Sequence, residues 1–89
     1  NNQLANTHAE RFLAYSHNQQ DEDSFKEIDL FAKYRMNGIE YNKSSMTGKQ
    51  YEDNKEFLNY QVILMNAWHD ILFGRYDEAR KSLSSAKKF

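Results

Sequence analysis

The sequence contains no cysteine and no proline, and only three of its 89 residues are glycine. The absence of cysteine excludes a disulfide framework and any metal site built from thiolates, and it leaves the redox compartment undecided. Because proline and glycine interrupt regular structure, their scarcity favours long helices. The longest uninterrupted aliphatic run, Val62–Met65, is far shorter than the roughly 18 residues that a membrane-spanning helix needs.

The chain also lacks an excess of charge of either sign. Twelve basic and 13 acidic residues leave a net charge of −1, so there is no overall attraction to nucleic acid or to an anionic membrane. The composition is 39% hydrophobic and 15% aromatic, which is too apolar for a disordered chain. Residues 1–89 are few enough for a single domain. Because the sequence has no signal-peptide core and no cysteine, we expect a cytoplasmic protein. Because the chain begins at Asn1 instead of Met, we also expect it to be a fragment of a longer chain.

Three short motifs predict where helices begin. In a capping box, a Ser or Thr is followed three residues later by Glu or Gln, and the two side chains satisfy two backbone N–H groups at the helix start. The sequence has this spacing at Thr7–Glu10, at Ser24–Glu27 and at Thr47–Gln50. We therefore expect helices to start at these three places.

Apolar residues after each box recur at helical spacing, which predicts four helices. The second helix stops near Gly38 or runs on through Tyr41, and the third covers about 48–73. Gly74 ends the third helix, and a fourth follows it. The fold class predicted from this pattern is all-α, with four antiparallel helices in two helical hairpins. The residues that carry the spacing are Ala9, Phe12 and Leu13; Phe25, Ile28, Phe31 and Ala32; Phe57, Tyr60, Leu64, Ala67, Trp68 and Ile71; and Tyr76, Ala79, Leu83 and Ala86.

The third helix is apolar around most of its circumference. Only Asn59, Asn66 and Asp70 form a narrow polar seam along it. A helix of this kind must be covered on more than one side. It is therefore the central helix of a bundle or of a solenoid, or it awaits a partner.

The stretch at about 60–89 resembles a tetratricopeptide repeat. The matching residues are Gly74 to Ala79, then Leu83 and Ala86, with Ala67 upstream at a position where the repeat has a small residue. The resemblance implies that Gly74 permits a tight turn, that Tyr76 wedges between the two helices, and that Ala79 lets their backbones approach.

A second, more divergent copy of the same pattern runs over about 8–36. Here Asp23 takes the place of the turn glycine, Phe25 that of the tyrosine and Ile28 that of the small alanine. This alignment places the two copies 51 residues apart, with Phe25 equivalent to Tyr76.

The resemblance also implies a function and a site. Such repeats stack into curved surfaces that bind peptides or partner helices, and the first helix of each hairpin lines the concave side. We therefore expect a non-catalytic adaptor, regulator or scaffold that binds a protein or peptide or associates with itself. The residues placed on this side are Leu13, His17, Gln61, Leu64, Met65 and Trp68.

No motif for catalysis, a metal or a cofactor accompanies this pattern. His17 and Asp21 share a helical spacing that could form one edge of a metal site, but Asp21 begins an acidic run that reads better as a loop and cap. We expect no enzyme activity, no cofactor, no metal, and neither a nucleic-acid nor a membrane partner. The alternative is a free-standing four-helix bundle with a structural or inhibitory (immunity-type) role, in which the third helix is fully wrapped by the other three.

Overall fold

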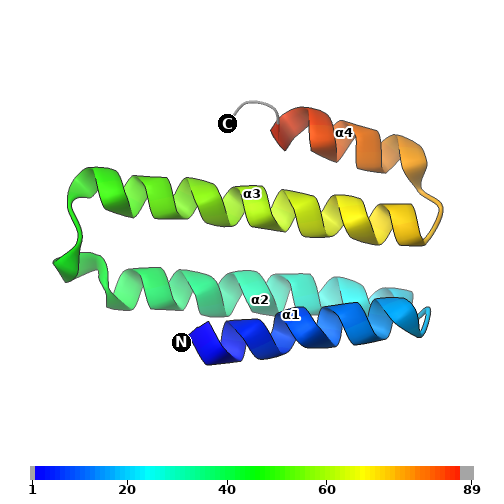
Figure 1. Ribbon diagram of the computed structural model, residues 1–89, viewed down its shortest axis with the longest axis horizontal. Helices are drawn as coiled ribbons and strands as arrows, with labels where there is room; N and C mark the ends of the chain where they lie inside the picture. Colours follow the sequence, from blue (N-terminus) through cyan, green and yellow to red (C-terminus); the bar gives the residue numbers. More distant parts are fainter. Residues whose placement is uncertain (1, 87–89) are drawn as a thin grey trace.

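The computed structural model of the chain describes residues 2–86, which form four α-helices and one short 3₁₀-helix, with no strand in this part of the chain. The predicted all-α fold of four antiparallel helices in two hairpins is confirmed. The helices are α1 (Asn2–His17), α2 (Asp21–Tyr41), η1 (Lys43–Ser45), α3 (Gly48–Leu72) and α4 (Tyr76–Ala86) (Figure 1).

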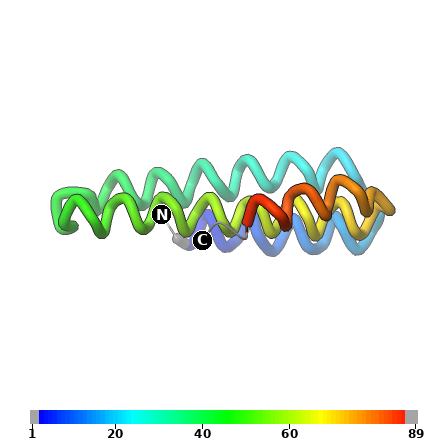
Figure 2. The backbone as a smooth tube through the Cα atoms, turned by 90° about the horizontal axis from the view of Figure 1, so that it is seen from above, coloured from blue at the N-terminus to red at the C-terminus, as the bar shows by residue number. Residues whose placement is uncertain are grey.

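The two hairpins pack through their middle helices. Helices α1 and α2 pair with each other, α3 pairs with α4, and α2 packs along α3. In Figure 1, α3 lies between α4 on one side and the α1–α2 pair on the other. Seen from above, α4 overlies one half of α3 and α2 lies to one side (Figure 2). The result is a flat molecule whose Cα positions extend 41 × 28 × 12 Å, and α3 is covered on two sides, as its apolar circumference requires.

Only one of the three predicted capping boxes exists, at the start of α3. The backbone N–H of Gln50 donates to Thr47 Oγ1 at 3.1 Å, and the backbone N–H of Thr47 donates to Gln50 Oε1 at 2.9 Å. Thr7 instead lies inside α1, which begins at Asn2, and its hydroxyl donates to the carbonyl of Gln3 at 2.9 Å. A Thr–x–x–Glu spacing inside a helix is also compatible with this bond to the preceding turn, so the predicted start at Thr7 is wrong.

The predicted start of α2 at Ser24 is wrong by one turn. Helix α2 begins at Asp21, and the hydroxyl of Ser24 donates to the Asp21 carbonyl at 3.0 Å within the first turn. The acidic run from Asp21 to Asp23 occupies that turn, where the helix dipole favours negative charge. At its other end α2 continues through Gly38 to Tyr41, so Gly38 is not its C-terminal cap.

The turns of the two hairpins have the same geometry. Gln19 and Gly74 both adopt a left-handed backbone, with φ of 60° and 79°. In each turn the next N–H bonds to a carbonyl five residues back, from Gln20 to Tyr15 at 2.8 Å and from Arg75 to Asp70 at 2.7 Å. This pattern is the Schellman motif.

The repeated turn corrects the alignment of the two copies. Gln19, and not Asp23, is the residue equivalent to Gly74, so the hairpins are related by 55 positions instead of 51. The residue equivalent to Ala79 is then Ser24, and both are buried, with 0% and 2% of their surface exposed. The alignment made from the sequence is therefore displaced by four residues, about one helical turn. Asp23 and Phe25, on which it was based, are exposed residues of α2 and do not belong to the turn.

Two of the three residues that were given roles from the resemblance, Tyr76 and Ala79, behave differently. Ala79 is buried between α3 and α4, as predicted, because a small side chain permits close packing. Tyr76 is 60% exposed, so its predicted place as a wedge between the helices is wrong. As the first residue of α4 it lies at the surface of the turn. The last residues of the predicted repeat, 87–89, lie outside the described residues.

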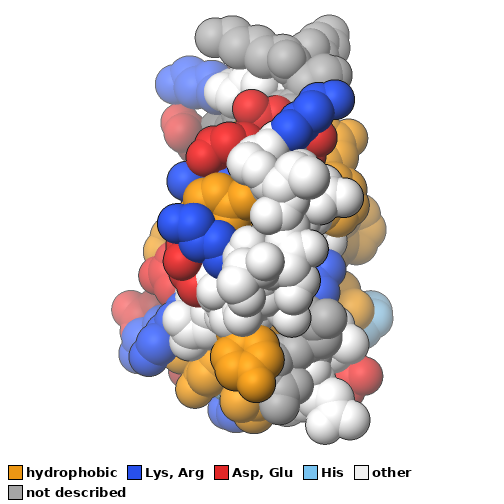
Figure 3. Space-filling view, turned by 90° about the vertical axis from the view of Figure 1, so that its left-hand side faces the viewer, with side chains coloured by type: hydrophobic (Ala, Val, Ile, Leu, Met, Phe, Trp, Pro, Cys, Tyr) orange, Lys and Arg blue, Asp and Glu red, His pale blue; other side chains and the backbone are white. Residues whose placement is uncertain are grey.

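The buried core is small and the surface carries many large apolar side chains. Ala5, Phe31 and Leu58 form the core cluster, with partly buried residues around them. Figure 3 views the end that carries the α2–α3 connection, where hydrophobic side chains show at the surface between acidic and basic ones. No helix within residues 2–86 is long and apolar enough to cross a bilayer.

Candidate partner-binding groove

A groove of about 520 Å³ lies between α1 and α3, and α2 forms its floor. Most of the side chains along it are apolar, and among the described residues that line it the only charged side chain is an arginine. The lining residues are Asn6, Ala9, Phe12 and Leu13 from α1, Phe31 and Arg35 from α2, and Gln61, Leu64, Met65 and Trp68 from α3.

The structure brings together five of the six residues that the sequence placed on the binding side, and they line this groove: Leu13, Gln61, Leu64, Met65 and Trp68. They meet because α1 and α3 run in the same direction, each antiparallel to α2 between them (Figure 1).

His17 is the sixth predicted residue, and it does not line the groove. It is exposed and is the last residue of α1, one turn beyond Leu13. The groove does not reach this turn, so the resemblance, which placed both residues on the binding side, does not bring them into one site.

The sequence analysis missed the contribution of α2. Phe31 is buried at the floor, and the Arg35 guanidinium lies 5.8 Å from the centre of the Phe31 ring. Their spacing of four residues puts them on one face of a helix, which is a signal that could have paired them. The sequence pattern does not indicate that α2 is accessible between α1 and α3, because this depends on how the helices pack.

The apolar side chains of the groove are open to solvent. Leu13 is 52% exposed and Trp68 is 48% exposed. Helix α3 is thus not wrapped on this side by the rest of the described chain. Complete burial of a fully exposed side chain of this size contributes about 1.5–3 kcal/mol. Because these side chains are already about half buried, a partner that covers them would gain roughly half of that from each.

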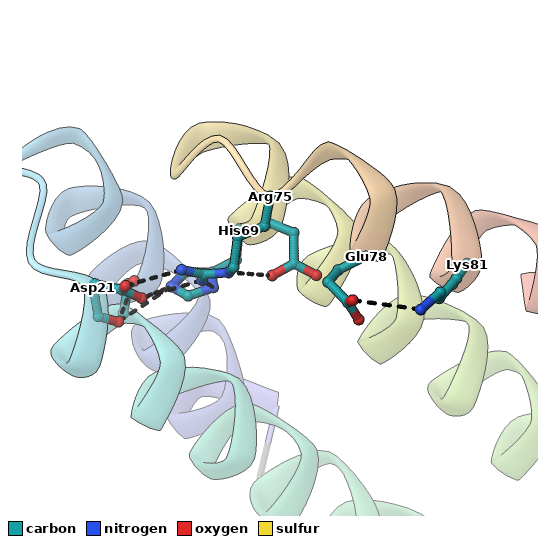
Figure 4. Close-up of polar contacts among 7 residues, drawn as sticks. Asp21, His69, Arg75, Glu78 and Lys81 are labelled. Carbon is teal, nitrogen blue, oxygen red and sulfur yellow. Dashed lines mark hydrogen bonds and ion pairs between the residues drawn. The ribbon is translucent and has the colours of Figure 1, made fainter.

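A cluster of charged groups holds the two hairpins together at one end of the groove, and we call it the turn clamp. Asp21, at the start of α2, accepts two bonds from the Arg75 guanidinium, at 3.1 and 3.3 Å. Arg75 also donates through Nε to Asp70 at 3.0 Å. His69 Nε2 lies 2.9 Å from Asp21 Oδ1. Figure 4 shows Asp21 facing His69 and Arg75 across the junction of the hairpins.

The contacts of His69 favour one tautomer of its ring. A guanidinium nitrogen of Arg75 lies 3.2 Å from His69 Nδ1, and because it can only donate, Nδ1 accepts and carries no hydrogen. The hydrogen is then on Nε2, which donates to Asp21. His69 is 1% exposed and packs against the rings of Phe25 and Phe73, at centroid distances of 5.6 and 4.9 Å. A buried ring with both nitrogens engaged positions the helices and has no access to a substrate.

The clamp shifts the pKa values of its two half-exposed members, Asp21 and Arg75. Hydrogen bonds from Arg75 lower the pKa of the Asp21 carboxyl below its ordinary value, with a smaller effect from His69. The same bonds to Asp21, followed by those to Asp70, raise the pKa of Arg75. Both shifts favour the charged forms, which is the expected result when opposite charges share hydrogen bonds.

A buried acidic side chain, Glu27, lies within the first hairpin. Glu27 of α2 is 3% exposed and bonds to His8 Nδ1 and to Arg11 Nε, the latter at 3.3 Å. The His8 ring also stacks on Tyr34, with centroids 5.2 Å apart. These contacts pair the carboxylate, so it acts as a tie between α1 and α2.

The metal edge considered for His17 and Asp21 does not form. The Asp21 carboxylate is bound to Arg75 and His69, whereas His17 is exposed at the end of α1. Within residues 2–86 there is no group of three or more His, Cys, Asp or Glu side chains that could hold a metal ion.

Comparison with known proteins finds no match to a family model, to a curated protein or to a solved structure. The resemblance to a tetratricopeptide repeat therefore stays a prediction, and the arguments about function rest on the geometry of this chain.

Proposed function

We propose that this chain is a non-catalytic binding module, an adaptor or regulator, whose groove holds an amphipathic helix of a partner protein. The observation that carries the proposal is the open apolar surface between α1 and α3, where Leu13, Leu64 and Trp68 are 52%, 37% and 48% exposed. A helix laid into such a groove buries its own apolar face against these side chains.

The charge of the groove selects among amphipathic helices. Arg35 is its single charged lining residue, and Asn6 and Gln61 add polar groups without charge. A partner helix with acidic residues beside its apolar stripe would place a carboxylate at Arg35, which guanidinium groups bind well. The proposed partner is thus an acidic amphipathic helix.

The alternative role, a free-standing bundle with a structural or inhibitory (immunity-type) function, is less well supported. It requires the third helix to be enclosed by the other three. The half-exposed Trp68 and the open side of α3 favour a surface that receives a partner.

The fluorescence of Trp68, the only tryptophan in the chain, tests the proposal. The probe is a synthetic 18-residue helix of Leu and Glu with its leucines at helical spacing. We expect its binding to shift the emission of Trp68 to shorter wavelength, because the indole leaves water. We expect Leu13→Ala to weaken binding about four- to tenfold, because covering the half-exposed leucine contributes about 0.8–1.5 kcal/mol.

Leu72→Ala is the matched control, since Leu72 is 45% exposed but does not line the groove. It should bind the peptide as the unchanged protein does. An unshifted emission spectrum, or equal losses in the two variants, would contradict the proposal. Sedimentation velocity shows whether a second copy of the chain occupies the groove instead.

A further inference from the structure

A second depression, of about 840 Å³, lies on the other side of α3, and we call it the trough. Phe57 and Tyr60 of α3 and Leu83 of α4 provide its apolar walls. Asp53 and Glu56 stand along the same part of α3, and Leu64 and Ala86 complete the lining. Leu64 also lines the groove. Neither the groove residues of α1 nor those of α2 contribute to it.

The trough exists because the helices of the second hairpin differ in length. Helix α3 has 25 residues and α4 has 11, which correspond to about 37 and 16 Å. Figure 1 shows α4 ending above the middle of α3. The first half of α3 is therefore not covered on this side by residues 2–86, and Phe57 is 56% exposed.

The two carboxylates of the trough are available for a partner. Asp53 and Glu56 are both exposed, and neither forms an ion pair with a basic side chain of residues 2–86. Their neighbour Glu52 differs, because it pairs with Lys55 at 3.8 Å. Two acidic groups beside an apolar wall create a local negative potential that has no counter-charge in the described chain.

The spacing of these residues suits a positively charged helix. Asp53 and Phe57 are four residues apart, as are Glu56 and Tyr60, so each acidic side chain lies one helical turn before an aromatic one on the same face. A lysine that reaches such a face can contact a carboxylate and a ring together. The chain already shows this contact on Tyr51, where the Lys43 and Lys55 ammonium groups lie 4.6 and 4.9 Å from the ring centre.

We propose that the trough is a second docking surface, which binds a basic amphipathic helix of a partner protein. The aliphatic side chains of the partner helix pack on Phe57, Tyr60 and Leu83, and its lysines or arginines lie beside Asp53 and Glu56. Apart from Leu64, the residues of the trough and of the groove are different, and the two proposed partners have opposite charges. The proposal for the trough therefore does not rest on occupation of the groove.

Titration calorimetry with a designed pair of peptides tests the trough. The probe is an 18-residue helix of Leu and Lys with leucines at helical spacing, and its sibling carries Glu at every Lys position. We expect the Lys peptide to bind and the double variant Asp53→Asn, Glu56→Gln to weaken binding about five- to tenfold at low salt, because each exposed ion pair contributes up to about 1 kcal/mol.

The matched control for charge is Asp77→Asn with Glu78→Gln, which removes two exposed acids of α4 outside the trough. It should leave affinity for the Lys peptide within about twofold. Phe57→Ala should weaken binding about tenfold through lost apolar burial. Leu13→Ala, in the groove, should leave it unchanged, which separates this test from that of the proposed function.

Three outcomes would overturn the trough as a docking surface for a basic helix. The first is an equal loss in both pairs of charge variants, which would indicate non-specific attraction. The second is binding of the Glu sibling in the trough with similar affinity. The third is a dimer in sedimentation velocity that Phe57→Ala dissociates, because the occupant would then be a second copy of the chain.

Discussion

Asp21 joins parts of the chain that are far apart in sequence. Its carboxylate contacts His69 and Arg75, which lie 48 and 54 positions later. It does so from the first turn of α2, where the helix dipole also favours its negative charge. A single side chain thus links the start of one hairpin to the turn of the other.

This contact makes the stability of the protein depend on pH in acid. The folded-state pKa of Asp21 is lower than the unfolded value of about 3.9. Its contribution is therefore present in full above about pH 5 and is lost as the pH falls through the folded pKa. We expect Asp21→Asn to lower stability at pH 7 by no more than about 1 kcal/mol, because the side chain is 46% exposed.

Thermal unfolding between pH 7 and pH 2.5, followed by circular dichroism, measures the effect. The difference between Asp21→Asn and the unchanged protein should shrink as the pH falls below about 4. Asp77→Asn, which removes an exposed acid paired with Arg80, serves as the control. A difference that stays constant down to pH 2.5 would show that Asp21 stabilises the fold by some means other than its charge.

At the scale of the helices, the two Schellman turns provide an internal comparison. Gly74 and Gln19 hold equivalent left-handed positions, at φ of 79° and 60°. A Cβ at Gly74 would have no atom within 4 Å, so crowding by neighbours plays no part. The identity of the residue should then act through the backbone alone.

We expect substitutions at the two turns to have opposite signs. Gly74→Ala should destabilise the protein by about 1 kcal/mol, because a side chain disfavours the left-handed region. Gln19→Gly should stabilise it by about 0.5–1 kcal/mol for the same reason. Urea unfolding measures both. Changes of the same sign would mean that the two turns are not equivalent.

The helix boundaries show how far local sequence determines structure. The box at Thr47 was predictable because a polar loop precedes it and leaves the N–H groups of α3 without other partners. The identical spacings at Thr7 and Ser24 lie inside helices, where hydroxyls bond to carbonyls of the preceding turn. The motif does not contain the information that distinguishes these cases, since that depends on where the upstream chain is already helical.

At the scale of the whole molecule, α3 is packed unevenly along its length. Its second half lies between α2 and α4, whereas its first half has no α4 beside it. We expect backbone amides in residues 62–72 to exchange with solvent at least about tenfold more slowly than those in 51–57, because local opening of the covered half exposes more apolar surface. Hydrogen exchange followed by NMR measures this. Uniform protection along α3 would contradict the unequal cover.

The groove was partly predictable and the turn clamp was not. The resemblance to a repeat placed Leu13, Leu64 and Trp68 on the binding side, and the structure brings these three residues into one groove. Arg35 enters the groove only through the packing of α2 below the other two helices. The partners of Asp21 depend on how one hairpin is placed on the other, which no local pattern specifies.

The turn clamp has a consequence for the groove between the hairpins. One end of the pair is fixed by the ion pairs of Asp21, and the other by the short covalent connection through η1. Because both ends of the hairpin pair are held, we expect the width of the groove to change little when a partner helix binds. A preorganised groove loses little conformational entropy on binding, so a modest contact area can suffice for useful affinity.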